Sequence, residues 1–372
     1  MELINKSNYK ELKKIIENQL FKKVLVVGGA HSFVNSGAKK IVYKFLKNKE
    51  KNVFLKKKKL PEINELLKLN KVIRIFNPDL IISIGGGSVM DLSKISNVTC
   101  NNDNLKKQIL NNNVLIKKAH CKLIAIPTTA GSGAEVTTNA VIYVNNIKYS
   151  VEHELIKPTY MALFPELVVK NDKLSILQSS AFDSFAQAVE SMFSVKSTSE
   201  SLLNSKKSIK FFLANYKNFI SNKNLENAFK LSLSSYYSGK AISISKTIAP
   251  HAVSYPFTSL FNVDHGHAVS LTFDSFLKFN YENNARSVSK YDLVDRYNLL
   301  FKYTNSKNID DLMNNINRIK QDLSLENKLS KINKKIPGKL NLILDGINIQ
   351  RLNNNPIKIE KKNILGILKK II

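Results

Sequence analysis

Short apolar runs alternate with longer amphipathic segments through the first half of the chain. The apolar runs lie in residues 22–29 (KKVLVVGG), in 52–55 (NVFL), and at the starts of 78–97 (PDLIISIGGGSVMDLSKISN) and 122–135 (KLIAIPTTAGSGAE). Between these runs, apolar positions recur with helical spacing, as in residues 36–49 and 60–77. Alternating strands and helices predict an α/β domain with a parallel sheet, in which binding sites lie at the carboxyl ends of the strands.

The second half of the chain consists of long amphipathic segments in which glycine is rare. Helical periodicity runs through residues 175–195, 201–220 and 225–245. Residues 300–372 are richer in lysine and asparagine and less periodic. We therefore predict an α/β domain at residues 1–172 and an all-helical domain at residues 173–372.

The composition is that of a globular protein with a basic surface. The chain has 372 residues, of which 43% are hydrophobic, and a formal net charge of +28. The positive residues are nearly all lysine, whereas specific nucleic-acid surfaces favour arginine. We interpret the charge as a solvated surface that attracts anionic substrates, and we expect no nucleic-acid partner.

Other features of the sequence bear on the location of the protein. No apolar run approaches the roughly 20 residues of a membrane span, and the N-terminal residues lack the apolar centre of a signal peptide. Cys100 and Cys121 form neither a disulfide framework nor a CxxC motif. We expect a cytoplasmic protein with no membrane partner, and we expect it to form a homodimer.

Two loops that follow predicted strands carry glycines or hydroxyl side chains. The first contains Gly85, Gly86 and Gly87, and Ser88 and Asp91 open the helix after it. Glycine lets a ligand approach the backbone, and the N-terminus of a helix favours a pyrophosphate. The alternative is a tight turn with Asp91 as a helix cap.

The second loop supplies hydroxyl groups from Thr128, Thr129 and Ser132. A polar turn alone would explain this loop, but two such loops after successive strands favour a nucleotide site.

A carboxylate and several imidazoles form a candidate metal site in the second half. Asp183 and Gln187 are four residues apart and share a helix face, and His251 and His265 flank a stretch that contains a proline. Two histidines and one carboxylate suit Fe(II), and Zn(II) accepts the same set. The alternatives are a half-exposed polar stripe for Asp183 and ordinary core histidines for the rest.

Four motifs in this order resemble the iron-containing (group III) alcohol dehydrogenase family: GGGSVMDLSK, IPTTAGSGAEVT, FDSFAQAVE and HAVSYPFTSLFNVDHGHAV. The resemblance extends over essentially the whole chain. It implies an N-terminal dinucleotide-binding α/β domain, a C-terminal all-helical domain and a metal between them. It also implies an NAD(P)-dependent alcohol dehydrogenase or aldehyde reductase.

The resemblance places Asp183, His251 and His265 at metal-ligand positions of the family. Gln187 stands where most members have a third histidine ligand, and we include it in the predicted metal set of Fe(II) or Zn(II). Tyr255 stands where many members have a histidine that relays a proton. The high ordinary pKa of tyrosine weakens that role, so His267 is a second candidate for the proton donor.

A narrower resemblance is to the subgroup that reduces phosphonoacetaldehyde to 2-hydroxyethylphosphonate in phosphonate biosynthesis, whose members also carry glutamine at the position of Gln187. It implies a small anionic aldehyde as substrate, for which we predict contacts from Lys246, Thr247 and Asn139. Another short aldehyde or alcohol is the alternative substrate.

The choice between the two nicotinamide cofactors depends on the loop after the first apolar run. Gly29 and Ser32 lie in VVGGAHSF, where NAD-preferring members often carry an aspartate. The resemblance therefore permits NADP, with NAD as the alternative. We also assign Lys148 to the predicted cofactor site, together with Gly85–Ser88, Asp91 and the hydroxyl loop.

Overall fold

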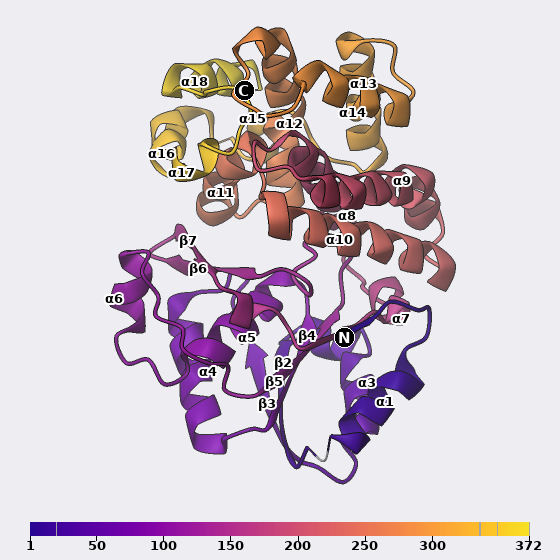
Figure 1. Ribbon diagram of the computed structural model, residues 1–372, viewed down its shortest axis with the longest axis vertical. Coiled ribbons are helices and arrows are strands. Elements are labelled where there is room, and N and C mark those ends of the chain that lie inside the picture. The colour runs from indigo at the N-terminus through magenta and orange to yellow at the C-terminus, as the bar shows by residue number, and fades with distance from the viewer. Residues whose placement is uncertain (20, 335, 348, 372) are drawn as a thin grey trace. The chain divides into compact units, whose positions relative to one another are not determined.

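The computed structural model describes residues 1–19, 21–334, 336–347 and 349–371, and these divide into two compact units (Figure 1). The first unit contains residues 1–173 together with 223–233. The second contains residues 174–222 and those from 234 onward. The first unit therefore includes a short stretch that lies beyond the boundary predicted at residues 172 and 173.

The first unit is built on a six-stranded parallel sheet with the strand order β1-β8-β5-β4-β2-β3. A separate antiparallel hairpin pairs β6 with β7. The predicted parallel sheet is confirmed, whereas the hairpin and the short strands β1 and β8 were not predicted. The strand bounds are β1 Glu2–Leu3, β2 Lys23–Gly29, β3 Glu50–Lys56, β4 Leu80–Gly85, β5 Lys122–Pro127, β6 Asn139–Val144, β7 Ile147–Glu152 and β8 Tyr160–Ala162.

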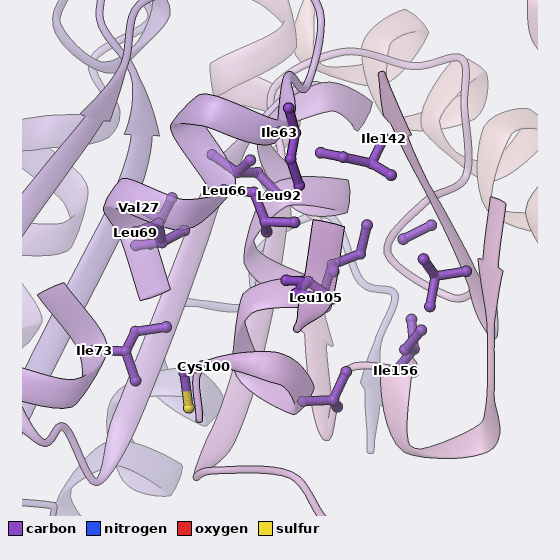
Figure 2. Close-up of a cluster of buried hydrophobic side chains, with 14 of the residues drawn as sticks. Val27, Ile63, Leu66, Leu69, Ile73, Leu92, Cys100, Leu105, Ile142 and Ile156 are labelled. Atoms are coloured by element: carbon purple, nitrogen blue, oxygen red, sulfur yellow. The ribbon is translucent and has the colours of Figure 1, made fainter. Parts of the chain in front are cut away.

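Helices cover both faces of this sheet because successive strand side chains alternate between two apolar clusters. Leu25 and Val27 of β2 pack with helices α4 and α5, as Figure 2 shows for part of that cluster. Val24 and Val26 pack on the opposite face with α1 and α3. The helices of this unit are α1 Tyr9–Asn18, α2 Ser32–Asn35, α3 Ala38–Phe45, α4 Ile63–Phe76, α5 Gly87–Thr99, α6 Leu105–Leu110, α7 Pro165–Val169 and the 3₁₀ helix η1 Glu154–Ile156.

The sheet reverses its winding between β2 and β4. From β2 the chain moves outward to β3 and then returns to place β4 on the other side of β2. Ligands of open α/β sheets bind at such a switch point, beyond the carboxyl ends of the strands. Gly29 and Gly85, which end β2 and β4, therefore mark the predicted binding edge.

The second unit contains helices and no β-strand among the residues that the structure describes. Long helices form its first part, and side-chain caps from Thr198, Asp292 and Asn308 begin three of them. Helix α10, Leu225–Ser245, begins in the first unit and continues into the second at residue 234. The other helices are α8 Leu174–Phe193, α9 Ser199–Ser221, α11 Ala249–Phe261, α12 His265–Glu282, α13 Leu293–Thr304, α14 Ile309–Asp322, α15 Leu329–Ile332, α16 Leu340–Asp345, α17 Ile349–Leu352, α18 Lys361–Lys370 and the 3₁₀ helices η2 Asn284–Arg286 and η3 Pro337–Lys339.

The lysine- and asparagine-rich end of the chain belongs to the core of the second unit. Leu329, Ile343 and Ile364 are buried in one cluster with Val253 and Phe257 of α11. The weak periodicity of this region reflects short helices, since α15, α16 and α17 have four to six residues each. Among the described helices, none combines the length and the apolar character that a membrane span requires.

Candidate functional site

The glycine loop after β4 lies where a ligand can reach it. Gly86 and Gly87 are partly exposed, although β4 itself is buried. Helix α5 begins at Gly87, and no side chain caps it. A Cβ atom added at Gly87 would lie 2.7 Å from the Oγ atom of Ser132, so a side chain at this position would require Ser132 to move. The loop thus presents the N-terminus of a helix without a competing cap, as a phosphate requires.

The hydroxyl loop lies directly beside the glycine loop. The Thr128 amide donates to the Gly85 carbonyl at 3.0 Å, and the Thr129 side chain lies 3.5 Å from the position of a Cβ atom at Gly86. The Oγ1 atom of Thr128 is buried and has no hydrogen-bond partner among the described residues. A buried hydroxyl without a partner is unusual in a folded protein. This orphaned group at the carboxyl end of β5 fits a polar ligand such as a dinucleotide.

Lys94 of α5 holds the far end of the hydroxyl loop. Its side chain is fully buried, and the Nζ atom donates to the Ala134 carbonyl, the Thr137 hydroxyl and the Asn139 carbonyl at 2.7–2.9 Å. Burial lowers the pKa of Lys94 to about 8, against the opposing effect of the Asp91 and Glu135 carboxylates. The lysine therefore fixes the loop to α5, a role that the glycine and hydroxyl pattern of the sequence did not indicate.

Asp91 lies inside α5 rather than at its cap, because Gly86 occupies the N-cap position. The capping alternative for Asp91 is therefore wrong. Burial raises the pKa of Asp91 to about 6, while Lys94, Lys148 and a hydrogen bond from the Val141 backbone lower it. The structure thus brings Lys148 of β7 within electrostatic range of Asp91, and the cofactor roles of both residues stay predictions.

Gly29 and Ser32 meet at the end of β2. A Cβ atom at Gly29 would lie 2.6 Å from the Oγ atom of Ser32, which begins α2. The two residues therefore form one tight turn at the switch point. The choice between NAD and NADP stays a prediction.

Three of the predicted metal ligands come together in the second unit. Asp183 of α8, His251 of α11 and His265 of α12 each offer a ligand atom, and these atoms lie within 4.8 Å of one another. Asp183 and His251 are buried, and the two imidazole rings lie 5.3 Å apart. A carboxylate with two imidazoles is a donor set that Fe(II) and Zn(II) accept, so these residues fit the implied metal.

Glu190 orients His251 toward this site. One oxygen of Glu190 lies 2.5 Å from His251 Nδ1, and the other accepts hydrogen bonds from the backbone amides of Ile248 and His251. The other ring nitrogen, Nε2, then points at Asp183, at 3.2 Å. Burial alone would lower the pKa of His251, but the Glu190 and Asp183 carboxylates raise it to about 9. The arrangement is that of a carboxylate that fixes the tautomer and direction of a metal-binding histidine.

Gln187 contacts the site through its amide nitrogen. Its Nε2 atom donates to Asp183 Oδ2 at 3.1 Å, and its Oε1 atom accepts from the Ser238 hydroxyl of α10 at 3.1 Å. The amide oxygen, which would be the ligand atom, faces Ser238. The role of Gln187 as a metal ligand stays a prediction, and its observed contact is a hydrogen bond to Asp183.

Gly266 allows α12 to approach α8 at the position of Asp183. A Cβ atom on Gly266 would lie 1.9 Å from the Ser179 carbonyl oxygen and 2.9 Å from the Cβ atom of Asp183. This close approach brings the neighbouring residue His265 to the carboxylate. A side chain at position 266 would separate two of the three candidate ligands.

Tyr255 and Thr247 lie next to the metal-binding set. The Tyr255 ring is stacked on that of His265 at 6.0 Å, and its hydroxyl hydrogen-bonds with the Thr247 side chain. Burial raises the pKa of Tyr255, so the phenol keeps its proton at neutral pH. Lys246 has a left-handed backbone, with φ of 64°, and its ammonium donates to the Ser243 carbonyl at 3.1 Å.

His267 lies two residues beyond His265 on α12, so the two side chains leave the helix in different directions. The Nε2 atom of His267 lies 2.9 Å from the Glu326 carbonyl oxygen, and burial lowers the pKa of this ring. Its role as a proton donor stays a prediction, as does the substrate role of Asn139 in the first unit.

Sequence reasoning missed two residues beside the metal set. Glu190 follows Gln187 by three residues on α8, and this spacing, which places both side chains on one helix face, was the available signal. Arg351 lies over the Tyr255 ring at 5.8 Å, although it follows Tyr255 by almost a hundred residues. No local pattern connects those two positions.

Family models match both halves of the chain. Residues 3–165 match "Iron-containing alcohol dehydrogenase", and residues 178–372 match "Fe-containing alcohol dehydrogenase family, C-terminal". The chain therefore belongs to the iron-containing alcohol dehydrogenase family, as the four motifs predicted.

Two curated relatives illustrate the range of this family. The chain is 27% identical to the phosphonoacetaldehyde reductase of Streptomyces viridochromogenes, over 57% of this chain and 56% of that protein. It is 30% identical to the 4-hydroxybutyrate dehydrogenase of Clostridium kluyveri, over 55% of each chain. The matched part of this chain thus spans about half the length of these two relatives.

Solved structures share the fold over the whole chain. The sulfoacetaldehyde reductase from Bifidobacterium kashiwanohense, in complex with NAD+, superposes with a TM-score of 0.87 at 23% identity and covers 100% of this chain and 96% of that one. The iron-containing alcohol dehydrogenase from Thermotoga maritima gives a TM-score of 0.82 at 23% identity, with coverage of 100% and 97%. These likenesses confirm the predicted fold class, an α/β domain with a parallel sheet followed by a helical one.

Proposed function

We propose that this protein is a metal-dependent NAD(P)H oxidoreductase that reduces phosphonoacetaldehyde to 2-hydroxyethylphosphonate. The observation that carries the proposal is the set of Asp183, His251 and His265, whose ligand atoms lie within 4.8 Å in a chain of the iron-containing alcohol dehydrogenase family. The phosphonoacetaldehyde reductase among its relatives supports the substrate. We include a cytoplasmic location, a homodimer and the absence of a nucleic-acid partner in this proposal.

The residues of the metal set determine how the aldehyde would be activated. Asp183, His251 and His265 would hold a divalent metal, with Fe(II) as our first choice and Zn(II) as the alternative. A metal held there supplies Lewis acidity at the aldehyde oxygen. Glu190 keeps Nδ1 of His251 engaged, so that Nε2 remains directed at the site.

The cofactor would be held by the two loops of the first unit. The N-terminus of α5 and the glycines before it suit the pyrophosphate, and Thr128 has a buried hydroxyl that lacks a partner within the described ranges. NAD(P)H supplies the hydride, and the protein contributes its binding and orientation. Lys94 fixes the hydroxyl loop so that these groups are in place before the cofactor arrives.

Tyr255 is our candidate for the proton donor to the alkoxide product. It is buried, it keeps its proton because burial raises its pKa, and it is stacked on His265. Its hydroxyl is bonded to Thr247, which can pass a proton in turn. Because Tyr255 is stacked on His265, it is a better placed donor than His267, whose ring contacts the Glu326 carbonyl.

The test is the oxidation of NADPH and NADH by purified protein loaded separately with Fe(II) or Zn(II). Phosphonoacetaldehyde, succinic semialdehyde and acetaldehyde are compared at equal concentration. We expect phosphonoacetaldehyde to be reduced with the highest kcat/KM and His265→Gln to abolish turnover. His153→Gln changes an exposed histidine in the first unit and serves as the matched control.

Equal rates with the three aldehydes would retain the oxidoreductase and reject the phosphonate. Preference for succinic semialdehyde would favour a second candidate function, the conversion of a 4-hydroxy acid, in keeping with the 4-hydroxybutyrate dehydrogenase among the relatives. No oxidation of either cofactor by protein that contains one metal per chain would refute the proposed activity.

A further inference from the structure

We propose that Arg351 binds the anionic group of the substrate and thereby determines which aldehydes the protein accepts. This inference rests on the proposed function, because it concerns the substrate of the same site. Arg351 belongs to the second unit, as do the metal-binding residues, so its position relative to them is given by the packing of one compact unit.

The first argument is the position of the guanidinium. Its central carbon lies 5.8 Å from the centre of the Tyr255 ring, and that ring is stacked on His265. Tyr255 follows His251 by four residues on α11, so both side chains lie on one face of the helix. Arg351 therefore lies beside the metal set, separated from it by a single aromatic ring.

The second argument is that the chain holds this arginine in place. Asn354 is buried, its amide donates to the Thr247 carbonyl at 3.2 Å, and its own carbonyl accepts from the Val195 amide at 3.0 Å. The segment after α17 is thus fixed to the residue whose side chain bonds Tyr255. Arg351 and Thr247 thus both contact Tyr255, and a cation and a hydroxyl beside one residue could bind one anion.

The third argument is that the guanidinium remains available for a ligand. Arg351 is half-buried, and none of the acidic side chains in the described ranges forms an ion pair with it. The chain has five arginines, and the others contact groups elsewhere: Arg74 pairs with Asp103, Arg296 stacks on Tyr291, and Arg286 and Arg318 bond asparagines. A planar guanidinium offers two parallel donors to a phosphonate, a sulfonate or a carboxylate.

Lysine is the alternative cation at this place. Lys246 precedes Thr247, but its ammonium donates to the carbonyl of Ser243, in the helix α10 that ends just before Lys246. A lysine ammonium also lacks the bidentate geometry of the guanidinium. The positions favour Arg351 over Lys246 as the cation that binds the substrate. A comparison of Arg351→Gln with Lys246→Gln separates the two possibilities.

The experiment measures kcat/KM of metal-loaded wild type, Arg351→Gln and Arg351→Lys with phosphonoacetaldehyde and acetaldehyde. We expect Arg351→Gln to lose about 30-fold with the phosphonate and less than about threefold with acetaldehyde, because only the anion uses the guanidinium. Arg351→Lys should lie between the two, since it keeps the charge without the fork. Arg318→Gln removes the same charge from an exposed position on α14 and should change neither value.

Equal losses with both aldehydes would overturn the inference, because Arg351 would then act on structure or metal binding in general. A selective loss in Lys246→Gln, with none in Arg351→Gln, would also overturn it. If Arg351→Gln does not fold, as judged by its melting temperature and metal content, Arg351→Lys carries the same comparison.

A binding measurement keeps this inference separate from the proposed reductase activity. Calorimetric titration of 2-hydroxyethylphosphonate into metal-loaded protein requires no turnover. Weaker binding by Arg351→Gln, with unchanged binding by Arg318→Gln, would support the anion site even if wild type reduced no aldehyde. Equal binding by wild type and Arg351→Gln, or no binding by wild type, would overturn it.

Discussion

Glu190 bonds both the ring and the backbone of His251. Its Oε1 atom lies 2.5 Å from Nδ1, while Oε2 accepts from the amides of His251 and Ile248 at the start of α11. One buried carboxylate therefore fixes a candidate metal ligand and caps the helix that carries it. Its loss should affect the metal site without removing any ligand.

We expect Glu190→Gln to weaken metal binding by about 10- to 100-fold, which is the usual effect of removing the partner of a metal-binding histidine. A neutral amide no longer holds the imidazole in one tautomer. Competition with a chromogenic chelator measures the affinity. Glu200→Gln on α9 removes an exposed carboxylate and should leave the affinity unchanged. Wild-type affinity in Glu190→Gln would mean that the carboxylate serves the helix alone.

A substitution of Gln187 tests whether its side chain binds the metal or only donates a hydrogen bond to Asp183. Because its nitrogen faces Asp183 and its oxygen faces Ser238, we expect Gln187→Met to keep one metal per chain with an affinity loss of about tenfold or less. His265→Gln should lose bound metal on dialysis. Both variants are measured by elemental analysis after dialysis against a weak chelator. Equal metal loss in the two would establish Gln187 as a ligand.

Gly266 makes the close contact between α8 and α12 possible. Gly266→Ala would place a methyl group 1.9 Å from the Ser179 carbonyl, so we expect the free energy of unfolding to fall by about 3 kcal/mol. The variant should also lose metal, because His265 moves with α12. Gly366→Ala on α18 is the matched control, since nothing lies within 4 Å of its added Cβ atom. In urea unfolding, this control should gain about 0.5–1 kcal/mol.

The raised pKa of the buried Glu135 carboxyl should make the stability of the protein depend on pH. Burial raises the pKa of this carboxyl from 4.5 to about 7, against the effects of its own backbone amide and of Lys94. Between these pH values the folded protein keeps a proton that the unfolded chain releases, so stability falls as pH rises. The loss is about 3 kcal/mol by pH 7, at roughly 1.4 kcal/mol for each pKa unit.

Glu135→Gln carries no such proton, and urea unfolding from pH 4 to pH 8 tests the prediction. The variant should match wild type near pH 4 and exceed its stability above pH 7. Glu11→Gln on the exposed side of α1 should keep the wild-type profile. Parallel profiles for wild type and Glu135→Gln would show that Glu135 ionises normally in the folded protein.

The sequence by itself determined the parallel sheet, the helical second half and the loops at the carboxyl ends of two strands. These follow from local patterns: apolar runs that end in glycine, as at Gly29 and Gly85, and helical spacing in residues 175–245. Asp183, His251 and His265 were also identified, because scarce imidazoles in one stretch and a carboxylate in an apolar helix are visible along the chain.

Tertiary structure alone decided which groups surround those residues. Ser238 turns the amide of Gln187, Glu190 directs His251, and Arg351 reaches Tyr255 from a distant helix. Periodicity describes one element at a time, whereas these contacts depend on how helices pack and on which side chain fills each space between them. The cluster of Asp183, His251 and His265 was therefore predictable from the sequence, whereas the contacts that Glu190, Ser238 and Arg351 make around it were not.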